Sequence, residues 1–230
     1  MGHNIYVDLM YLPYTFLSIS YLLDGIIVAG RFLITADAFL ILAYFFGHGF
    51  ASHFINEAYS SHFAESISAS KAKVIGYFSL LLSSFFGLTA AAILKWNIYL
   101  LAVGVLEIFF MITYNLPLTS FFHNDLVVSV AVGSLPALAG YIAADGSLSM
   151  MPFLLAALCG LIVSLEITPS RFIKRWRRMP SEPVKVVLKD GTEVALSLSD
   201  LVNRPERVIK IMLVISYLLP AFLFLLRICS

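Results

Sequence analysis

Two groups of polar residues stand out from a strongly apolar sequence, because each carries side chains that can bind metal ions or phosphate. The first group lies between residues 48 and 65 and contains His48, His53, Asn56, Glu57, Tyr59, Ser60, His62 and Glu65. Glu57 and Glu65 are about two helical turns apart, so one helix face would present both. Carboxylates and an amide at a helix end can coordinate Mg²⁺ together with a diphosphate. The structural alternative is that these residues only cap neighbouring helices and face water.

The second group of polar residues is dominated by arginine and lysine. It contains Glu166, Thr168, Pro169, Ser170, Arg171, Lys174, Arg175, Arg177 and Arg178. Arginine holds phosphate through its planar fork of donors, but basic residues beside a membrane span also anchor it at anionic headgroups. Glu166 ends an apolar run, and a carboxylate near hydrocarbon needs a partner or a role because its burial is costly. The residues alone leave binding site and membrane anchor equally open.

Three further carboxylates, Asp24, Asp37 and Glu107, lie within or at the edge of apolar segments. Asp24 and Glu107 are expected to face the interior of a helical bundle, where a contact between helices is the simplest role for them. The segment from Tyr114 to Pro117 is a helix stop, because proline removes a backbone donor and disfavours helix before it.

Composition indicates the elements that position these residues. Hydrophobic residues make up 60% of the 230-residue chain and charged residues 13%, against about half and about a quarter in soluble domains. This balance predicts an all-α membrane protein formed by a single domain, residues 1–230. The net charge of +1 gives no reason to expect a nucleic-acid partner. Seven segments are long and apolar enough to cross about 30 Å of hydrocarbon as helices, namely residues 9–30, 33–54, 73–94, 97–116, 124–144, 149–168 and 208–228.

The basic residues are distributed unevenly between the two sides of such a bundle. Twelve of the fifteen lysines and arginines follow the second or the sixth segment, and only Arg31, Lys95 and Arg227 fall on the opposite side. The positive-inside rule therefore predicts a cytoplasmic N-terminus, cytoplasmic long loops and a C-terminus on the opposite side. Both polar groups then share one face of the membrane.

The loop between the sixth and seventh segments is expected to hold a small insertion, residues 179–206. Asp190-Gly191 separates two alternating runs, and this pair is a strong β-hairpin signal because both turn residues need positive φ. A short helical turn after Ser199 is expected to end before Pro205. The open edges of a hairpin suit docking, so residues 184–197 are a candidate contact with another membrane protein.

The order of these polar elements resembles the UbiA superfamily of intramembrane prenyltransferases. That family carries an N-D-x-x-D-x-x-x-D motif after its second span, a D-x-x-x-D-R motif after its sixth and a tyrosine-containing loop between spans four and five. The corresponding places here hold Asn56-Glu57-Ala58-Tyr59-Ser60, Glu166-Ile167-Thr168-Pro169-Ser170-Arg171 and Tyr114. The start at Leu12-Pro13-Tyr14-Thr15 and residues 124–141 are also similar to the family, so the resemblance covers most of residues 5–230. The departures are serines at two acidic positions and seven spans in place of nine.

The resemblance implies a UbiA-like bundle of about seven helices that transfers a polyprenyl group from its diphosphate to an aromatic or lipid-like acceptor. Mg²⁺ would offset the charge that develops on the leaving diphosphate. By the same resemblance, the catalytic residues would be Glu57, Glu166 and Tyr114, the metal ligands Glu57, Glu65 and Glu166, and the diphosphate-binding residues Asn56, Ser60, Ser170, Arg171 and Lys174.

Two other functions remain open from the sequence. Three carboxylates could hold one Mg²⁺ ion but would supply too few ligands for two, and Ser60 and Ser170 are weak ligands. The chain is therefore alternatively a catalytically degenerate relative. Such a relative would bind a lipid, a quinone or a partner protein within the membrane. A transporter that uses Asp24 and Glu107 as an ion path is the third possibility, although no pair of broken helices recurs in two halves of the sequence.

Overall fold

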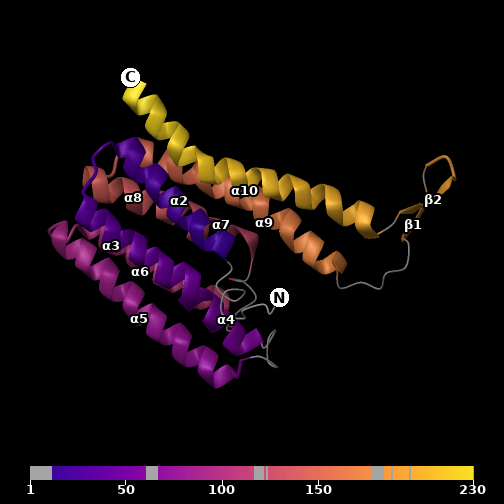
Figure 1. Cartoon of the computed structure of the whole chain (residues 1–230), viewed down its shortest axis with the longest axis horizontal. Coiled ribbons are helices and arrows are strands. Elements are labelled where there is room, and N and C mark those ends of the chain that lie inside the picture. The colour runs from indigo at the N-terminus through magenta and orange to yellow at the C-terminus, as the bar shows by residue number, and fades with distance from the viewer. Residues whose placement is uncertain are drawn as a thin grey trace, which may run out of the picture.

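The computed structural model describes residues 12–60, 67–116, 122, 124–177, 184–187, 189–196 and 198–229. Its helices are α2 (Leu12–Ala29), α3 (Ile34–Tyr44), η1 (Phe45–Ala51), α4 (Ser52–Ser60), α5 (Ala69–Ile93), α6 (Ile98–Asn115), α7 (Asp125–Ser129), η2 (Val130–Ser134), α8 (Leu135–Asp145), α9 (Met150–Arg177) and α10 (Leu198–Cys229). Figure 1 shows these helices packed side by side as an elongated bundle, with α9 and α10 antiparallel along one edge.

The helices of the bundle match the dimensions of a bilayer. In the described part of the chain, six helical segments are long and apolar enough to cross a membrane, and the shorter apolar helix Pro13–Ala29 lies among them. Two of the six are composite, because α3, η1 and α4 run on without a break, as do α7, η2 and α8. The chain is therefore a multi-pass integral membrane protein, and the prediction of an all-helical membrane bundle is confirmed.

The outward faces of the bundle are apolar. Large side chains on α5 and α10 point away from the other helices and are more than half exposed, among them Phe78, Leu81, Phe85, Leu218, Phe222 and Leu225. A soluble monomer rarely exposes a continuous apolar surface of this extent. Hydrocarbon removes the cost, so these faces are the ones that contact lipid.

The centre of the bundle is the close crossing of α2 and α8. A Cβ atom at Gly25 would lie 2.1 Å from the Ala137 carbonyl oxygen, and one at Gly140 would lie 2.0 Å from the Leu22 carbonyl oxygen. Only glycine permits two helix backbones to approach this closely, which is a common packing device in membranes. Leu22 and Ile142 beside the crossing are fully buried and belong to the largest apolar cluster.

Helices α9 and α10 are longer than the segments 149–168 and 208–228 that the apolar pattern indicates. The sequence-based expectation of a short turn ending before Pro205 is wrong, because α10 runs through this proline from Leu198 to Cys229. Ile173 of α9 packs with Val202 and Ile209 of α10, one on each side of Pro205. This contact between helices stabilises the helix on both sides of the missing backbone donor.

Two short strands lie between α9 and α10. Strand β1 (Val184–Val187) pairs antiparallel with β2 (Glu193–Leu196), and Val184 is opposite Leu196 in the register. Gly191 has a φ of +83°, and the Thr192 amide donates a 3.0 Å hydrogen bond to the Asp190 carboxylate. This backbone hydrogen bond lowers the pKa of the Asp190 carboxyl. Figure 1 shows the strands beyond the ends of α9 and α10, away from the bundle.

Candidate functional site

The first polar cluster joins the ends of three helices and is called the helix-end cluster below. The Arg171 guanidinium on α9 lies 2.7 Å from the Asp125 carboxylate on α7, and it donates a 2.9 Å hydrogen bond to the Tyr114 hydroxyl at the end of α6. The Thr168 hydroxyl donates a 3.1 Å hydrogen bond to the other oxygen of Asp125. Arg171 of α9 therefore contacts residues of two other helices, α6 and α7.

The local sequence explains how Asp125 and Arg171 meet. The Asn124 side chain accepts a 3.0 Å hydrogen bond from the Val127 amide and so caps α7. Asp125 then occupies the first position of the helix, where the helix dipole favours a negative charge. Arg171 reaches it because α9 continues through Pro169 to Arg177.

Asn115, next to Tyr114, extends the same end of the bundle to α4. Its side-chain amide donates hydrogen bonds of 2.9 Å to the Ser52 hydroxyl and 2.7 Å to the Met111 carbonyl oxygen. Asn115 is buried, so the pairing fixes the start of α4 against the end of α6. The beginning of α4 and the end of α9 are thus both fastened to the last turn of α6.

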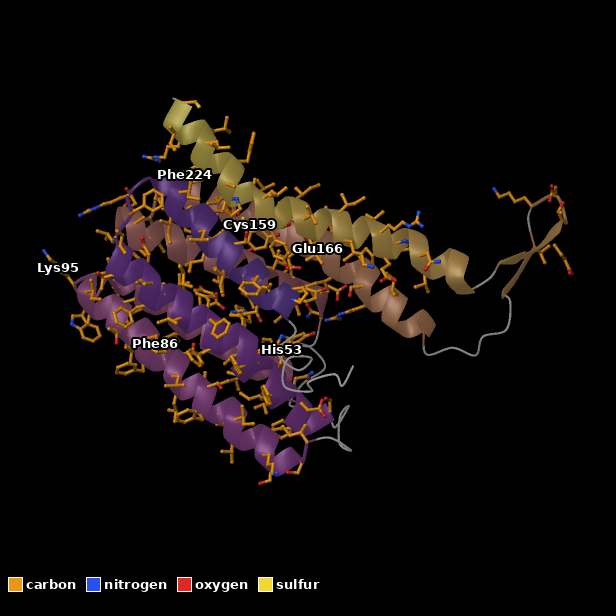
Figure 2. All side chains as sticks on the ribbon, in the orientation of Figure 1. His53, Phe86, Lys95, Cys159, Glu166 and Phe224 are labelled. Carbon is orange, nitrogen blue, oxygen red and sulfur yellow. The ribbon has the colours of Figure 1, made fainter. Side chains whose placement is uncertain are left out.

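Of the residues expected to form a diphosphate site, the structure brings Tyr114 and Arg171 together. Glu166 instead faces the contact of α9 with α2 and α10, where its carboxylate accepts a 2.9 Å hydrogen bond from the Ser216 hydroxyl. Five residues along an α-helix turn a side chain by about 140°, so Glu166 and Arg171 point to different sides of α9. Figure 2 shows Glu166 against α10 and clearly separated from His53, which precedes Glu57 by four residues.

The other expected site residues are spread over α4 and α9. Glu57 is 4% exposed, and the Ser60 hydroxyl is buried without a hydrogen bond within the described residues. Asn56 lies beside Glu57 on α4, and Ser170 is half-buried on α9. Lys174 also belongs to α9, whereas Glu65 lies outside the described residues.

The described residues do not fit a Mg²⁺ site. No three of their histidine, cysteine, aspartate or glutamate side chains come together as ligands. One oxygen of Glu166 is already taken by Ser216 from α10. Mg²⁺ needs oxygen ligands at near-octahedral positions, and a carboxylate turned into a helix contact does not supply them.

The second polar cluster lies inside the bundle and is centred on Glu107 of α6, so it is called the Glu107 cluster below. The Tyr44 hydroxyl donates a 2.9 Å hydrogen bond to one carboxylate oxygen, and His48 Nε2 lies 3.2 Å from the other. The Ser18 hydroxyl lies 3.4 Å from His48 Nδ1. The side chains of His48 and Glu107 are each 12% exposed, so the contact between them is almost entirely enclosed by protein.

A π-helix presents His48 to Glu107. The segment η1 makes wider turns than an α-helix, and such segments are frequent at functional sites. The glycines on each side of His48 allow η1 to press against its neighbours. A Cβ atom at Gly47 would lie 2.8 Å from Ser83 Oγ, and one at Gly49 would lie 2.8 Å from Thr15 Cγ2. Sequence reasoning named Glu107 and His48 separately but had no signal that joined them.

A cavity of about 210 Å³ adjoins the Glu107 cluster, between α3, η1, α5 and α6. Its polar lining residues are the hydrogen-bonded group of Tyr44, His48 and Glu107, together with Ser83 and Ser84 of α5, and most of the remaining wall is apolar. Gly104 of α6 lies on the wall, and a Cβ atom placed there would meet nothing within 4 Å. A side chain can therefore be added to this part of the wall without a clash at its first atom.

The cavity opens towards the lipid-facing side of the bundle. Leu88 of α5 and Val105 and Ile108 of α6 line it and are 50%, 67% and 36% exposed. These are apolar side chains on outward faces of membrane-spanning helices, so the opening between α5 and α6 leads into hydrocarbon. No family model, curated protein or solved structure matches the chain.

Proposed function

We propose that this protein binds a lipid-like ligand with a ring-shaped polar head, such as an isoprenoid quinone, in the cavity beside Glu107. In this proposal the chain is a catalytically degenerate relative of the UbiA prenyltransferases that serves as a lipid- or quinone-binding membrane subunit. The observation that carries the proposal is a cavity with a hydrogen-bonded polar group, mostly apolar walls and an opening towards lipid.

The size of the cavity supports a ring as the bound part. An apolar cavity of about 150 Å³ is enough to hold benzene, and the volume beside Glu107 is about 210 Å³. A substituted six-membered ring therefore fits, whereas a whole isoprenoid chain does not. The tail would leave between α5 and α6 and lie in the bilayer, so only the head needs to be enclosed.

The polar lining of the cavity offers hydrogen-bonding groups suited to a ring oxygen. The His48–Glu107 pair shares a proton at 3.2 Å, and Tyr44 fixes the second oxygen of the carboxylate. With the proton on His48 Nε2, a carbonyl oxygen of the ligand can be the second acceptor beside Glu107 in a three-centre hydrogen bond. Such a bond is favourable because no water competes in an apolar site. The apolar wall supplies affinity and the His48–Glu107 pair supplies orientation.

The test is binding of a radiolabelled quinone with a short isoprenoid tail to the purified protein in nanodiscs. Gly104→Leu adds a side chain on the cavity wall, at a position where a Cβ atom meets nothing within 4 Å, and is expected to abolish saturable binding. Ala102→Leu is the matched control, because Ala102 is exposed on the same helix and does not line the cavity. Glu107→Gln should weaken binding about tenfold through loss of a charge-assisted hydrogen bond worth ~1.5 kcal/mol.

Equal binding by Gly104→Leu and Ala102→Leu would refute the proposal, as would the absence of saturable binding by the unchanged protein. Both variants are first checked for a single symmetric elution peak in detergent. A folded Gly104→Leu variant with no binding, beside a binding Ala102→Leu variant, places the ligand in this cavity.

Prenyl transfer is the second candidate function, and the helix-end cluster favours it. Arg171 and Tyr114 occupy positions that the UbiA resemblance assigns to diphosphate binding and catalysis, and they lie in contact. The test is transfer of a labelled polyprenyl group from its diphosphate to an aromatic acceptor in the presence of Mg²⁺. Activity that is lost in Tyr114→Phe and Arg171→Ala would support transfer, and activity unchanged in both would exclude this site.

We also propose that the helix-end cluster and the β1–β2 segment face the cytoplasm. The lysines and arginines at that end of the bundle outnumber those at the other end twelve to three. In this orientation, the partners would be membrane lipids and a membrane protein that contacts residues 184–197. Deletion of residues 184–197 with an unchanged yield of a co-purifying protein would remove the docking role.

A further inference from the structure

A third set of polar residues is buried where α2, α9 and α10 meet, and neither the cavity nor the helix-end cluster includes it. Asp24 on α2 and Glu166 on α9 are both fully buried. Neither oxygen of Asp24 has a hydrogen-bond partner within the described residues, and one oxygen of Glu166 has none. Unpartnered carboxyl groups in such surroundings need a physical explanation.

These surroundings strongly disfavour an ionised carboxylate, so both groups hold a proton at rest. Moving a lone charge out of water costs several kcal/mol or more, and a buried group avoids that cost by taking up a proton. The ionisable side chains that face Asp24 are Tyr21 and Cys159, and those that face Glu166 are Tyr21 and Tyr217. None of the three is a cation, so no counter-ion among them stabilises the charged form.

A chain of hydroxyl groups leads away from Glu166 towards Asp24. The Tyr21 hydroxyl donates a 3.1 Å hydrogen bond to Ser216 Oγ, and Ser216 donates a 2.9 Å hydrogen bond to Glu166. Asp24 is three residues after Tyr21, which places both on one face of α2. Tyr21 interacts electrostatically with both carboxyl groups.

A partly exposed tyrosine lies near the Glu166 end of this chain. Tyr217, next to Ser216, is half-buried and interacts electrostatically with Glu166. Its hydroxyl donates a hydrogen bond to the carbonyl oxygen of Pro13, an exposed residue at the start of α2. Glu166 therefore has a partly exposed hydroxyl group among the side chains that face it, whereas Tyr21 and Cys159, which face Asp24, are both fully buried.

We propose that Asp24, Tyr21, Ser216 and Glu166 form a proton relay through the core of the α2–α9–α10 contact, with Asp24 and Glu166 as the two proton-holding groups. At rest both carboxyl groups hold a proton. After Glu166 has released its proton to a base in solvent, Asp24 gives its proton to the Tyr21 oxygen while Tyr21 passes its own to Ser216 and Ser216 passes its own to the transiently ionised Glu166. Asp24 is left ionised and Glu166 neutral, so charge and protons balance. Asp24 and Tyr21 are not hydrogen-bonded to each other in the structure, so this step needs rotation of the Asp24 carboxyl group or one bridging water molecule.

A proton is a better occupant of this place than a metal ion. No three acidic, histidine or cysteine side chains of the described residues come together as ligands. A cation such as Na⁺ or Ca²⁺ needs several oxygen ligands around it. One carboxyl group enclosed by apolar side chains satisfies a proton but not a metal ion.

The test is infrared spectroscopy of the purified protein in nanodiscs after transfer from H₂O to D₂O. A protonated carboxyl group has a carbonyl band apart from that of a carboxylate, and the band shifts when deuterium replaces the proton. We expect Asp24→Asn to remove one such band and Glu166→Gln to remove another. Tyr21→Phe should slow exchange of the Asp24 proton by about tenfold or more, a barrier change of ~1.4 kcal/mol.

Tyr141→Phe is the matched control, because Tyr141 is a half-buried tyrosine of α8 outside this chain. Ser216→Ala breaks the same chain at a second point and replaces Tyr21→Phe if that variant does not fold. Persistence of every protonated-carboxyl band in Asp24→Asn would overturn the proposal. Exchange as fast in folded Tyr21→Phe or Ser216→Ala as in Tyr141→Phe would overturn it as well.

Discussion

The Arg171 guanidinium lies 2.7 Å from the Asp125 carboxylate, and this pair joins the last turns of α9 to the first turn of α7. Both side chains are about one-third exposed, at 36% and 31%. Solvent screens such a pair, so its own contribution to stability is about 0.2–1 kcal/mol. Its larger structural effect is to hold Tyr114 beside the guanidinium and Thr168 beside the carboxylate in fixed positions.

A double-mutant cycle measures this relationship. Arg171→Ala and Asp125→Ala are each expected to lower the free energy of unfolding, and the double variant should lose ~0.5 kcal/mol less than the sum. Thermal unfolding in detergent, followed by circular dichroism, provides the values. Lys210→Ala is a control, because Lys210 pairs only at the surface with Glu206 of its own helix. Strict additivity of the two single variants would show that the pair contributes nothing.

Glycines at the α2–α8 crossing should be intolerant of side chains. Gly140→Ala places a Cβ atom 2.0 Å from a backbone oxygen of α2, so the helices must separate. The expected loss is about 1–3 kcal/mol, the usual cost of overpacking. Gly104→Ala is the matched control, because a Cβ atom there meets nothing within 4 Å. Comparable melting temperatures for the two variants would contradict the close crossing.

Arg227 should hold the end of α10 to the end of α2. Its guanidinium donates a 3.0 Å hydrogen bond to the Ile27 carbonyl oxygen, which the helix leaves unpaired at its C-terminus. Arg227→Ala is expected to cost about 1 kcal/mol and to raise hydrogen exchange at the C-terminal end of α10. Gly30→Ala should have the same effect, because φ is +79° there and a Cβ atom would overlap the guanidinium. Unchanged exchange in both variants would rule out this contact.

Single cysteines test the proposed orientation. In a Cys229→Ser background, Lys95→Cys and Lys189→Cys place a thiol at exposed positions shortly after α5 and between β1 and β2. Figure 1 shows the end of α5 next to α6 and the β1–β2 segment at opposite ends of the protein. A membrane-impermeant maleimide added to intact cells should label Lys95→Cys directly and Lys189→Cys only after permeabilisation. Cys159 is buried and serves as the internal background. The opposite labelling pattern would show that the protein has the reverse orientation in the membrane.

The helical spans were predictable because length and apolarity alone decide which segments cross a bilayer. Within the described residues, each predicted segment is helical over most of its length, six of the helical segments are long enough to cross a membrane, and α9 and α10 extend beyond the predicted bounds. Those extensions pass through Pro169 and Pro205, where local chemistry predicts a stop. Packing of Ile173 against Val202 and Ile209 outweighs that local preference, and packing between distant segments cannot be deduced from either segment alone.

The sequence indicated individual residues of the candidate sites, but not most of the contacts between them. Tyr114 and Arg171 were placed at the same end of the bundle, and they are in contact. The direction of Glu166 was not foreseen from its neighbours in sequence, since its partner Ser216 is 50 residues away. The cavity was invisible because it depends on a π-helical segment.

The gap between α5 and α6 has a consequence for how occupancy is controlled. A molecule that enters there never crosses water, so the concentration that matters is its mole fraction among the surrounding lipids. Partitioning into the bilayer has already removed the molecule from water, so binding depends only on whether the molecule is more stable in the cavity than among the acyl chains. A weak intrinsic preference for the cavity would then fill it wherever the ligand is an abundant membrane component, and dilution of that component with other lipid would empty it.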